Sequence, residues 1–327
     1  MDDTNDKSPF EQLRALVDAD DSEEAVTVLG HLETAPTESR KAALQALKPL
    51  AESTPTAVTP LASTLTGFLT DDERSVRLST AKRFVTLAEA APDALVDCVP
   101  PIAARLATDE EFYYVRARSA EALGYVVAAA PSVATPELIA DLRIGLSFDE
   151  PAVRTKLAKA LAYVALGNPG RLRHHVDDLA GHLDSENELV RYHLATALVA
   201  VGSEFPDALT EAVDVLTERA DDPNPYVRGR SAEALGLLSH ADIDTALPDN
   251  WGVDVVESEA AAAFLEPRIR FAVEGELPVD GIGDTEPIRE RSDEIVEAIS
   301  TPDGEECPHC GLAVPTDGPP ICPQCGL

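Results

Sequence analysis

A nine-residue motif recurs along this chain at a nearly constant interval, and it constrains the fold more than any other feature. It consists of a Val-Arg pair, two variable residues, a small or apolar residue, Ala, two further residues and a large apolar residue. Its arginines are separated by 37, 39, 38, 37 and 37 residues. The copies span residues 76–84, 115–123, 153–161, 190–198 and 227–235, after a degenerate first copy at 39–47. A period of this length indicates stacked supersecondary units.

Each unit has the same internal order. An amphipathic stretch precedes a short acidic turn, and the Val-Arg segment follows it; the amphipathic stretches are 57–69, 94–106, 136–146, 171–183 and 207–219. Asp in the turn can cap the following helix and places negative charge at its positive end. Nothing in this span alternates with period two, so we expect two helices per unit and no sheet.

The turn Asp, the Val-Arg pair and the Ala and Leu positions after it resemble the HEAT-repeat family, including the short repeats of phycobilin-lyase-type proteins. The resemblance covers about residues 20–240 and implies an all-α, right-handed α-solenoid of about six helix pairs. It also implies that motif arginines and turn Asp residues form a structural ladder between repeats. The arginines that match are Arg77, Arg116, Arg154, Arg191 and Arg228. Ser39-Arg40 departs from the motif, as an N-terminal capping repeat would.

A second column of residues lies beside this ladder. Two positions after each motif Arg the chain has Ala42, Ser79, Arg118, Lys156, His193 and Arg230, and five positions after it Gln45, Lys82, Glu121, Lys159, Thr196 and Glu233. Residues three apart share one helix face. One interpretation is a groove for an acidic partner, built from the cations of this column: Lys82, Arg118, Lys156, Lys159, His193 and Arg230. The other is internal charge balance through i,i+3 pairs with Glu121 and Glu233.

The charge of the chain is extreme, with 59 acidic and 26 basic residues and a formal net charge of −33. The acid is spread along the whole chain, so a locally acidic interaction tail does not account for it. The composition resembles that of proteins from salt-loving archaea, and we expect a halophilic protein. At molar salt the Debye length is about 3 Å, so a dense carboxylate surface stays soluble. No apolar run approaches the roughly 20 residues that span a bilayer. The N-terminus is acidic and polar, unlike a secretory signal, so we expect a cytoplasmic protein with no membrane partner.

The last residues contain the pattern Cys307-x2-Cys310-x11-Cys322-x2-Cys325. Two C-P-x-C-G turns present four thiolates, which is the ligand set of a structural zinc site. The pattern resembles the zinc-ribbon family, and it implies one Zn²⁺ as cofactor. A redox dithiol or a rubredoxin-type iron site uses the same spacing and stays open as an alternative. Neither Lys nor Arg occurs from 292 to 327, so a protein contact suits this ribbon better than phosphate.

The expected domains are an N-terminal acidic segment with a short helix (1–19), the HEAT-like solenoid (20–240), a C-terminal cap and acidic linker (241–304) and the zinc ribbon (305–327). Within the cap, Ser258–Glu266 and Ile288–Ser300 are expected to be helical, and Trp251 is a candidate to close the core. The oligomeric state is not determined by any of these features.

No phosphate loop, Ser elbow or paired catalytic motif is recognisable. We therefore predict a non-enzymatic scaffold that binds a protein through its solenoid, with the ribbon as a second docking module. A first alternative is a nucleic-acid- or ribosome-associated factor that uses the basic column. A second is a HEAT-like enzyme of the lyase or DNA glycosylase type, although a shared fold does not transfer chemistry.

The zinc assignment is tested by metal analysis of the purified full chain. We expect about one zinc per chain, and loss of most of it in the Cys307→Ser and Cys322→Ser variants, because each removes one of four thiolate ligands. The matched control is Cys98→Ser, which should leave the zinc content unchanged. Undiminished zinc in the two ribbon variants, or iron in place of zinc, would contradict the assignment.

Overall fold

The structure is a computed structural model that describes residues 8–108, 110–243, 245, 247–248, 251–253, 256, 258–274 and 281–300. Within these ranges all regular secondary structure is helical. The chain divides into two compact units, Met1–Ala160 and Leu161–Leu327. The four ribbon cysteines lie outside the described residues. Among the helices that are described, none is both long and apolar enough to cross a membrane.

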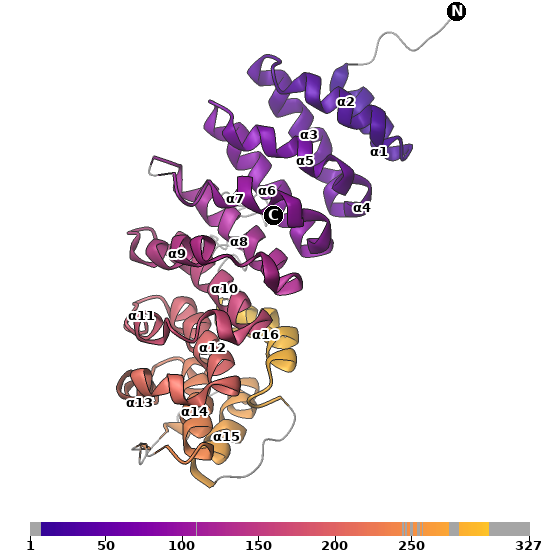
Figure 1. Cartoon of the computed structure of the whole chain (residues 1–327). Helices are drawn as coiled ribbons and strands as arrows, with labels where there is room; N and C mark the ends of the chain where they lie inside the picture. Colours follow the sequence, from indigo (N-terminus) through magenta and orange to yellow (C-terminus); the bar gives the residue numbers. More distant parts are fainter. Residues whose placement is uncertain are drawn as a thin grey trace, which may run out of the picture. The chain divides into compact units, whose positions relative to one another are not determined.

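The helices that carry the Val-Arg motif, here called the second helices, are long and continuous (Figure 1). They are α3 (Thr37–Ser53), α6 (Arg74–Ala90), α8 (Tyr113–Ala129), α10 (Pro151–Gly167), α12 (Glu188–Glu204) and α14 (Pro225–His240). The motif Val is buried in each of the last five. Asn187 and Asn224 cap α12 and α14 by accepting hydrogen bonds from backbone N–H groups of the first turn. These features confirm the predicted second helices.

The preceding segments, here called the first helices, are mostly not the single amphipathic helices predicted for them. Short α-helical and 3₁₀ turns follow one another instead: α4 (Pro55–Val58) and α5 (Ala62–Leu65), α7 (Val99–Ala103) after a 3₁₀ segment at Pro92–Cys98, α11 (Val176–Ala180), and α13 (Val213–Arg219) after Pro206–Ala212. Pro55, Pro92, Pro169 and Pro206 each stand at the first position of such a segment, where the missing N–H and the fixed φ of proline suit the start of a helical turn. α2 (Ser22–Leu32) and α9 (Pro136–Ile144) are longer.

Helices also stand at the two ends of the repeats. The N-terminal one is α1 (Pro9–Asp18), where Ser8 and Glu11 form a capping box. Beyond the last repeat lie α15 (Glu259–Glu274) and α16 (Thr285–Ser300), which confirm the two helices predicted there. Trp251 is buried.

The second unit buries its second helices on every side. Residues 190–202 of α12 and 226–236 of α14 are all buried. α15 packs against α14, and α16 packs against α12. Tyr192, Tyr226 and Val227 form one apolar cluster with Phe264 of α15 and with α16. A helix buried all round needs neighbours on each face, and here α15 and α16 supply the last of them.

The α14–α15 contact depends on a close approach at Gly236. A Cβ placed there would lie 2.4 Å from Cδ1 of Phe271 and 3.2 Å from the backbone of Ala272. Gly30 on α2 is a matched contrast, because a Cβ there would meet only a Thr64 methyl at 4.0 Å.

We therefore expect opposite effects from the same substitution at these two glycines. Gly236→Ala should lower the free energy of unfolding by about 1–3 kcal/mol through overpacking. Gly30→Ala should leave it unchanged or raise it by up to about 1 kcal/mol, because Ala is the better helix former. Urea unfolding in molar KCl, followed by circular dichroism, measures both. Equal effects of the two substitutions would contradict the close packing of α14 and α15.

Candidate binding surface

The motif arginines connect acidic residues of the following repeat with the backbone of their own turn. In the first unit, Arg40 meets Asp71, with Nε 2.6 Å from Oδ2. Arg77 donates from Nε to both carboxylate oxygens of Glu111 at 3.0 Å, and from Nη1 to the carbonyl of Asp71 at 2.8 Å. The acceptor here is Glu111, where the family resemblance implies a turn Asp.

The second unit repeats this geometry at Arg191. Its Nε and Nη2 donate to the two oxygens of buried Asp222 at 2.7 and 2.9 Å, and Nη1 donates to the Ser185 carbonyl at 2.7 Å. Arg228 donates to the carbonyls of Asp222 at 2.7 Å and of Gly252 at 3.4 Å. The last arginine of the series therefore contacts the segment after the repeats instead of another turn acid.

Two ladder positions differ in detail. Arg116 donates to the carbonyl of Thr108, and its guanidinium stacks 4.7 Å from the centroid of the Phe148 ring. Arg154 is half-buried on α10. Bidentate contacts with carboxylates and contacts with turn carbonyls are stabilising. Arg77 and Arg191 make both kinds of contact, each within its own unit.

Three cations of the basic column in the first unit, Arg118, Lys156 and Lys159, form a charge cluster around Glu121. Glu121 on α8 accepts from Arg118 Nη1 and from Lys156 Nζ of α10, each at 2.6 Å. Lys159 donates to the hydroxyl of Tyr125 at 3.2 Å and lies over its ring. Arg118, Glu121 and Lys159 are all buried. Glu121 thus joins two neighbouring second helices through one carboxylate.

Electrostatics keeps this carboxylate ionised. Burial raises the pKa of Glu121, but the charges of Lys156 and Arg118 outweigh it, so that the pKa is about 2 instead of 4.5. Burial also lowers the pKa of Lys156, which Glu121 partly offsets. An isolated buried charge is costly, whereas a hydrogen-bonded pair is retained. The cluster therefore holds α8 and α10 together.

The column in the second unit forms a related cluster around Glu233. Its Oε2 accepts from Arg230 Nη1 at 2.7 Å and from Arg268 Nε at 2.9 Å, and its Oε1 accepts from the Gly283 N–H at 2.8 Å. Arg230 is 1% exposed and Glu233 is fully buried. The sequence pattern indicates the Arg230–Glu233 pair but misses Arg268, which lies outside the repeat on α15. The sequence signal for this contact was Arg268 itself, a cation among the apolar residues on one face of α15.

The remaining members of the column show a gradient of exposure along the chain. His193 is buried within α12, and Lys82 is half-exposed on α6. The equivalent positions nearer the N-terminus are open, because Gln45 is exposed and Ala42 and Ser79 are half-exposed. The column is therefore not a continuous exposed line of cations. Its contacts favour internal charge balance over the acidic-partner groove.

Metal-ligating side chains are dispersed over the described residues. Among them, no group of three or more His, Cys, Asp or Glu side chains is arranged to hold a metal ion. Cys98 is a buried free thiol, and burial raises its pKa, so it behaves as a small apolar residue.

Comparison with known proteins supports the repeat architecture. The family described as HEAT repeats matches residues 176–265. No curated protein sequence matches the chain. Among solved structures, an engineered protein shares 23% identity with a TM-score of 0.62, covering 81% of this chain and 70% of its own.

Two further structures have the same fold. A designed armadillo repeat protein, solved in complex with the peptide (KR)4, shares 17% identity with a TM-score of 0.51 and covers 70% of this chain and 99% of its own. Kap121p shares 14% identity with a TM-score of 0.55; 90% of this chain is covered but only 33% of Kap121p. The fold is thus a HEAT/armadillo-like solenoid, which is typical of protein-binding scaffolds.

The pKa of Glu121 leads to a prediction about acid stability. Because this pKa is lower in the folded state, the unfolded chain binds more protons between pH 4.5 and about 2. The stabilisation is therefore complete above pH 4.5 and is lost as the pH falls toward 2. Glu121→Gln should lower the free energy of unfolding at pH 7 by on the order of 3 kcal/mol, and the deficit should shrink below pH 4.5.

The measurement is urea unfolding of parent and variant from pH 7 to pH 3 at constant molar KCl. The control is Glu38→Gln, an exposed residue on α3 of the same unit, which should stay within about 0.5 kcal/mol of the parent. A deficit that is independent of pH would contradict the assigned role of Glu121.

Proposed function

We propose that this chain is a non-enzymatic scaffold whose second helices bind a helical segment of a protein partner. The observation that supports this most directly is intramolecular. In the second unit, α16 already occupies the second-helix side as an amphipathic helix, with α11 and α13 on the opposite side (Figure 1). The fold thereby uses this surface to bind a helix supplied by its own chain.

The contacts of α16 have the character of a helix-in-groove interface. Ile288, Ile295 and Ile299 are its buried apolar residues, and Ile295 and Ile299 pack with Tyr192 and Tyr226. At the polar edge, the Tyr163 hydroxyl donates to Oδ1 of Asp293 at 3.3 Å. Spacing of anchors at i, i+3 or i+4 and i+7 is how amphipathic helices bind to grooves. A partner helix is therefore the chemistry that this layer suits.

The corresponding layer of the first unit supplies the proposed partner face. It comprises Ala42 and Gln45 on α3 and Ser79 and Lys82 on α6, which are half-exposed or exposed. These residues occupy the column positions that are buried in the second unit. The short side chains of Ala42 and Ser79 would let a partner helix approach closely, and aromatic or aliphatic residues of the partner would cover them.

The structural neighbours give support at the level of the fold. Designed armadillo repeat proteins of similar fold were made for modular peptide recognition, and one is seen with a basic peptide. The strongly acidic composition of this chain is compatible with a partner segment whose polar face is basic, since charge complementarity favours association.

The C-terminal zinc ribbon enters the proposal as a second docking module. A four-thiolate site has no open coordination position, so its role is structural. Without Lys or Arg between 292 and 327, this segment suits a protein surface better than a nucleic acid. The nucleic-acid alternative gains no support from the column cations, because Arg118, Lys156 and Arg230 contact Glu121 or Glu233.

Site-specific photo-crosslinking in the native host, at its own salt concentration, tests the proposal. A photoreactive amino acid at Gln45 or Ser79 should capture one protein species reproducibly. The same residue at Thr56 or Ser63, which are exposed on the first helices of the same unit, should not capture it. Ser79→Arg should reduce capture at Gln45 about tenfold, because the loss of about 1.4 kcal/mol of binding free energy lowers the affinity tenfold.

Arginine at Ser63 is the matched control and should leave capture at Gln45 unchanged. Predominant nucleic-acid adducts at Gln45 and Ser79 would favour the first alternative over the scaffold. Equal capture from both helix layers would contradict a partner face on the second helices.

A further inference from the structure

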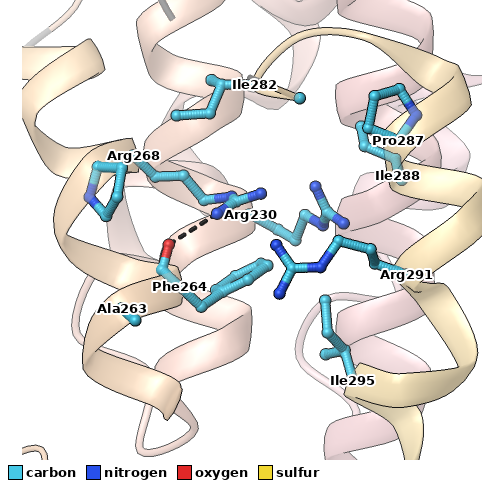
Figure 2. A pocket seen from close by; sticks show the side chains of 11 residues that line it. Arg230, Ala263, Phe264, Arg268, Ile282, Pro287, Ile288, Arg291 and Ile295 are labelled. Atoms are coloured by element: carbon cyan, nitrogen blue, oxygen red, sulfur yellow. Dashed lines mark hydrogen bonds between the residues drawn. The ribbon is translucent and has the colours of Figure 1, made fainter. Parts of the chain in front are cut away.

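A cavity lies within the second unit between α14, α15 and α16, apart from the proposed partner face. Its volume is about 170 Å³. Apolar side chains form most of its walls, among them Phe264, Ile282, Ile288 and Ile295. Three arginines also line it, one from each helix: Arg230, Arg268 and Arg291. Figure 2 shows their guanidinium groups extending into the same space.

The charge of this cavity opposes that of the chain. Within the described part of the chain, none of the lining residues is acidic, although the chain has 59 acidic residues and 26 basic ones. Arg230 and Arg268 share the single carboxylate of Glu233, and all three are buried. Two guanidiniums against one carboxylate leave one buried positive charge in excess.

Among the described residues, the other groups that contact these side chains are neutral or well exposed. Arg230 Nη2 also donates to the Tyr192 hydroxyl at 3.4 Å, which is neutral. The third hydrogen bond that Glu233 accepts comes from the backbone N–H of Gly283, which is neutral. Arg291 meets Glu294 at 3.5 Å, but both are well exposed, so this pair is weak. The Nε of Arg230 is buried and has no hydrogen-bond partner. A buried, incompletely paired guanidinium is costly, and an anion in the cavity would relieve that cost.

We propose that this cavity binds a small monoanion, namely a carboxylate attached to a compact apolar group. The carboxylate would lie against the three arginines, and the apolar group would contact the isoleucines and Phe264. Such a group occurs in free aliphatic acids and at the C-terminus of a protein chain that ends in an aliphatic residue. The proposal does not depend on the partner face of the first unit.

The charge and the apolar walls of the cavity favour a carboxylate over phosphate. One excess buried charge matches a monoanion, and guanidinium groups bind the two oxygens of a carboxylate in a fixed geometry. Phosphate would bring further oxygens and a second charge, which the isoleucine and proline walls cannot hydrogen-bond. The Phe264 ring stacks with the Arg268 guanidinium at 3.6 Å and holds it in place beside the cavity.

Isothermal titration of the full chain with 4-methylpentanoate in molar KCl tests the proposal. We expect saturable binding with a stoichiometry of one, and at least about tenfold weaker binding of 4-methylpentanamide, which lacks the charge. Inorganic phosphate should bind more weakly than the acid. A dipeptide that ends in a free leucine carboxylate, compared with its amide, distinguishes the two sources of the ligand.

Two arginine variants locate the site. Arg268→Gln leaves Arg230 and Glu233 as a balanced pair, so the chain should remain folded by circular dichroism while the affinity falls at least about tenfold. Arg291→Gln should weaken binding several-fold. Arg289→Gln is its control, because it makes the same change two residues away on α16 at an exposed position that does not line the cavity.

The expected pattern is weaker binding in Arg268→Gln and Arg291→Gln and unchanged binding in Arg289→Gln. Absence of saturable binding by the acid and by the dipeptide would overturn the proposal. Equal affinity for acid and amide, tighter binding of phosphate, or equal effects of the two α16 variants would also overturn it. Loss of partner capture at Gln45, in contrast, concerns only the proposed function.

Discussion

A single helix pair in this chain cannot bury its own apolar face, so the stability of each pair depends on its neighbour. The ladder arginines connect that packing to the turns. Arg191 illustrates the arrangement, because one guanidinium holds the carbonyl of its own turn and the carboxylate of Asp222 in the next. The turn geometry of one repeat thereby sets the position of the following one.

Buried charge is the second constraint on the fold. Each unit has one buried glutamate, Glu121 or Glu233, that accepts hydrogen bonds from cationic side chains of two different helices. Such sites resist rearrangement, since removal of the carboxylate leaves uncompensated cations in a low dielectric. Arg118, Lys156 and Arg230, which were candidates for binding a partner, contact these glutamates instead.

The covering of the second helices connects these constraints to function. In the second unit, α15 and α16 complete the burial of α12 and α14, whereas Gln45 and Ser79 in the first unit remain accessible. The second helices are thus covered by further helices in the second unit, whereas some of their side chains are accessible in the first unit. The arginine-lined cavity arises at the covered end, where α15 and α16 meet the column position Arg230.

The extent to which sequence predicted this structure differs between elements for physical reasons. The second helices follow from the motif because Val, Ala and Leu recur at helical spacing on a buried face. The first helices were less predictable, because the apolar pattern continues across the junctions between 3₁₀ and α-helical segments, such as those at 98–99 and 212–213. The hydrophobic spacing alone therefore suggested continuous helices where 3₁₀ turns occur.

The sequence by itself determined the repeat, its period, the second helices and the i,i+3 pairs Arg118–Glu121 and Arg230–Glu233, because all of these depend on spacing within one helix. Only the tertiary structure decided that these pairs are buried and that Arg268 joins Glu233 from 35 residues away. It also decided that α16 covers α12. Contacts between distant segments depend on how helices pack, and a spacing rule within one helix carries no information about them.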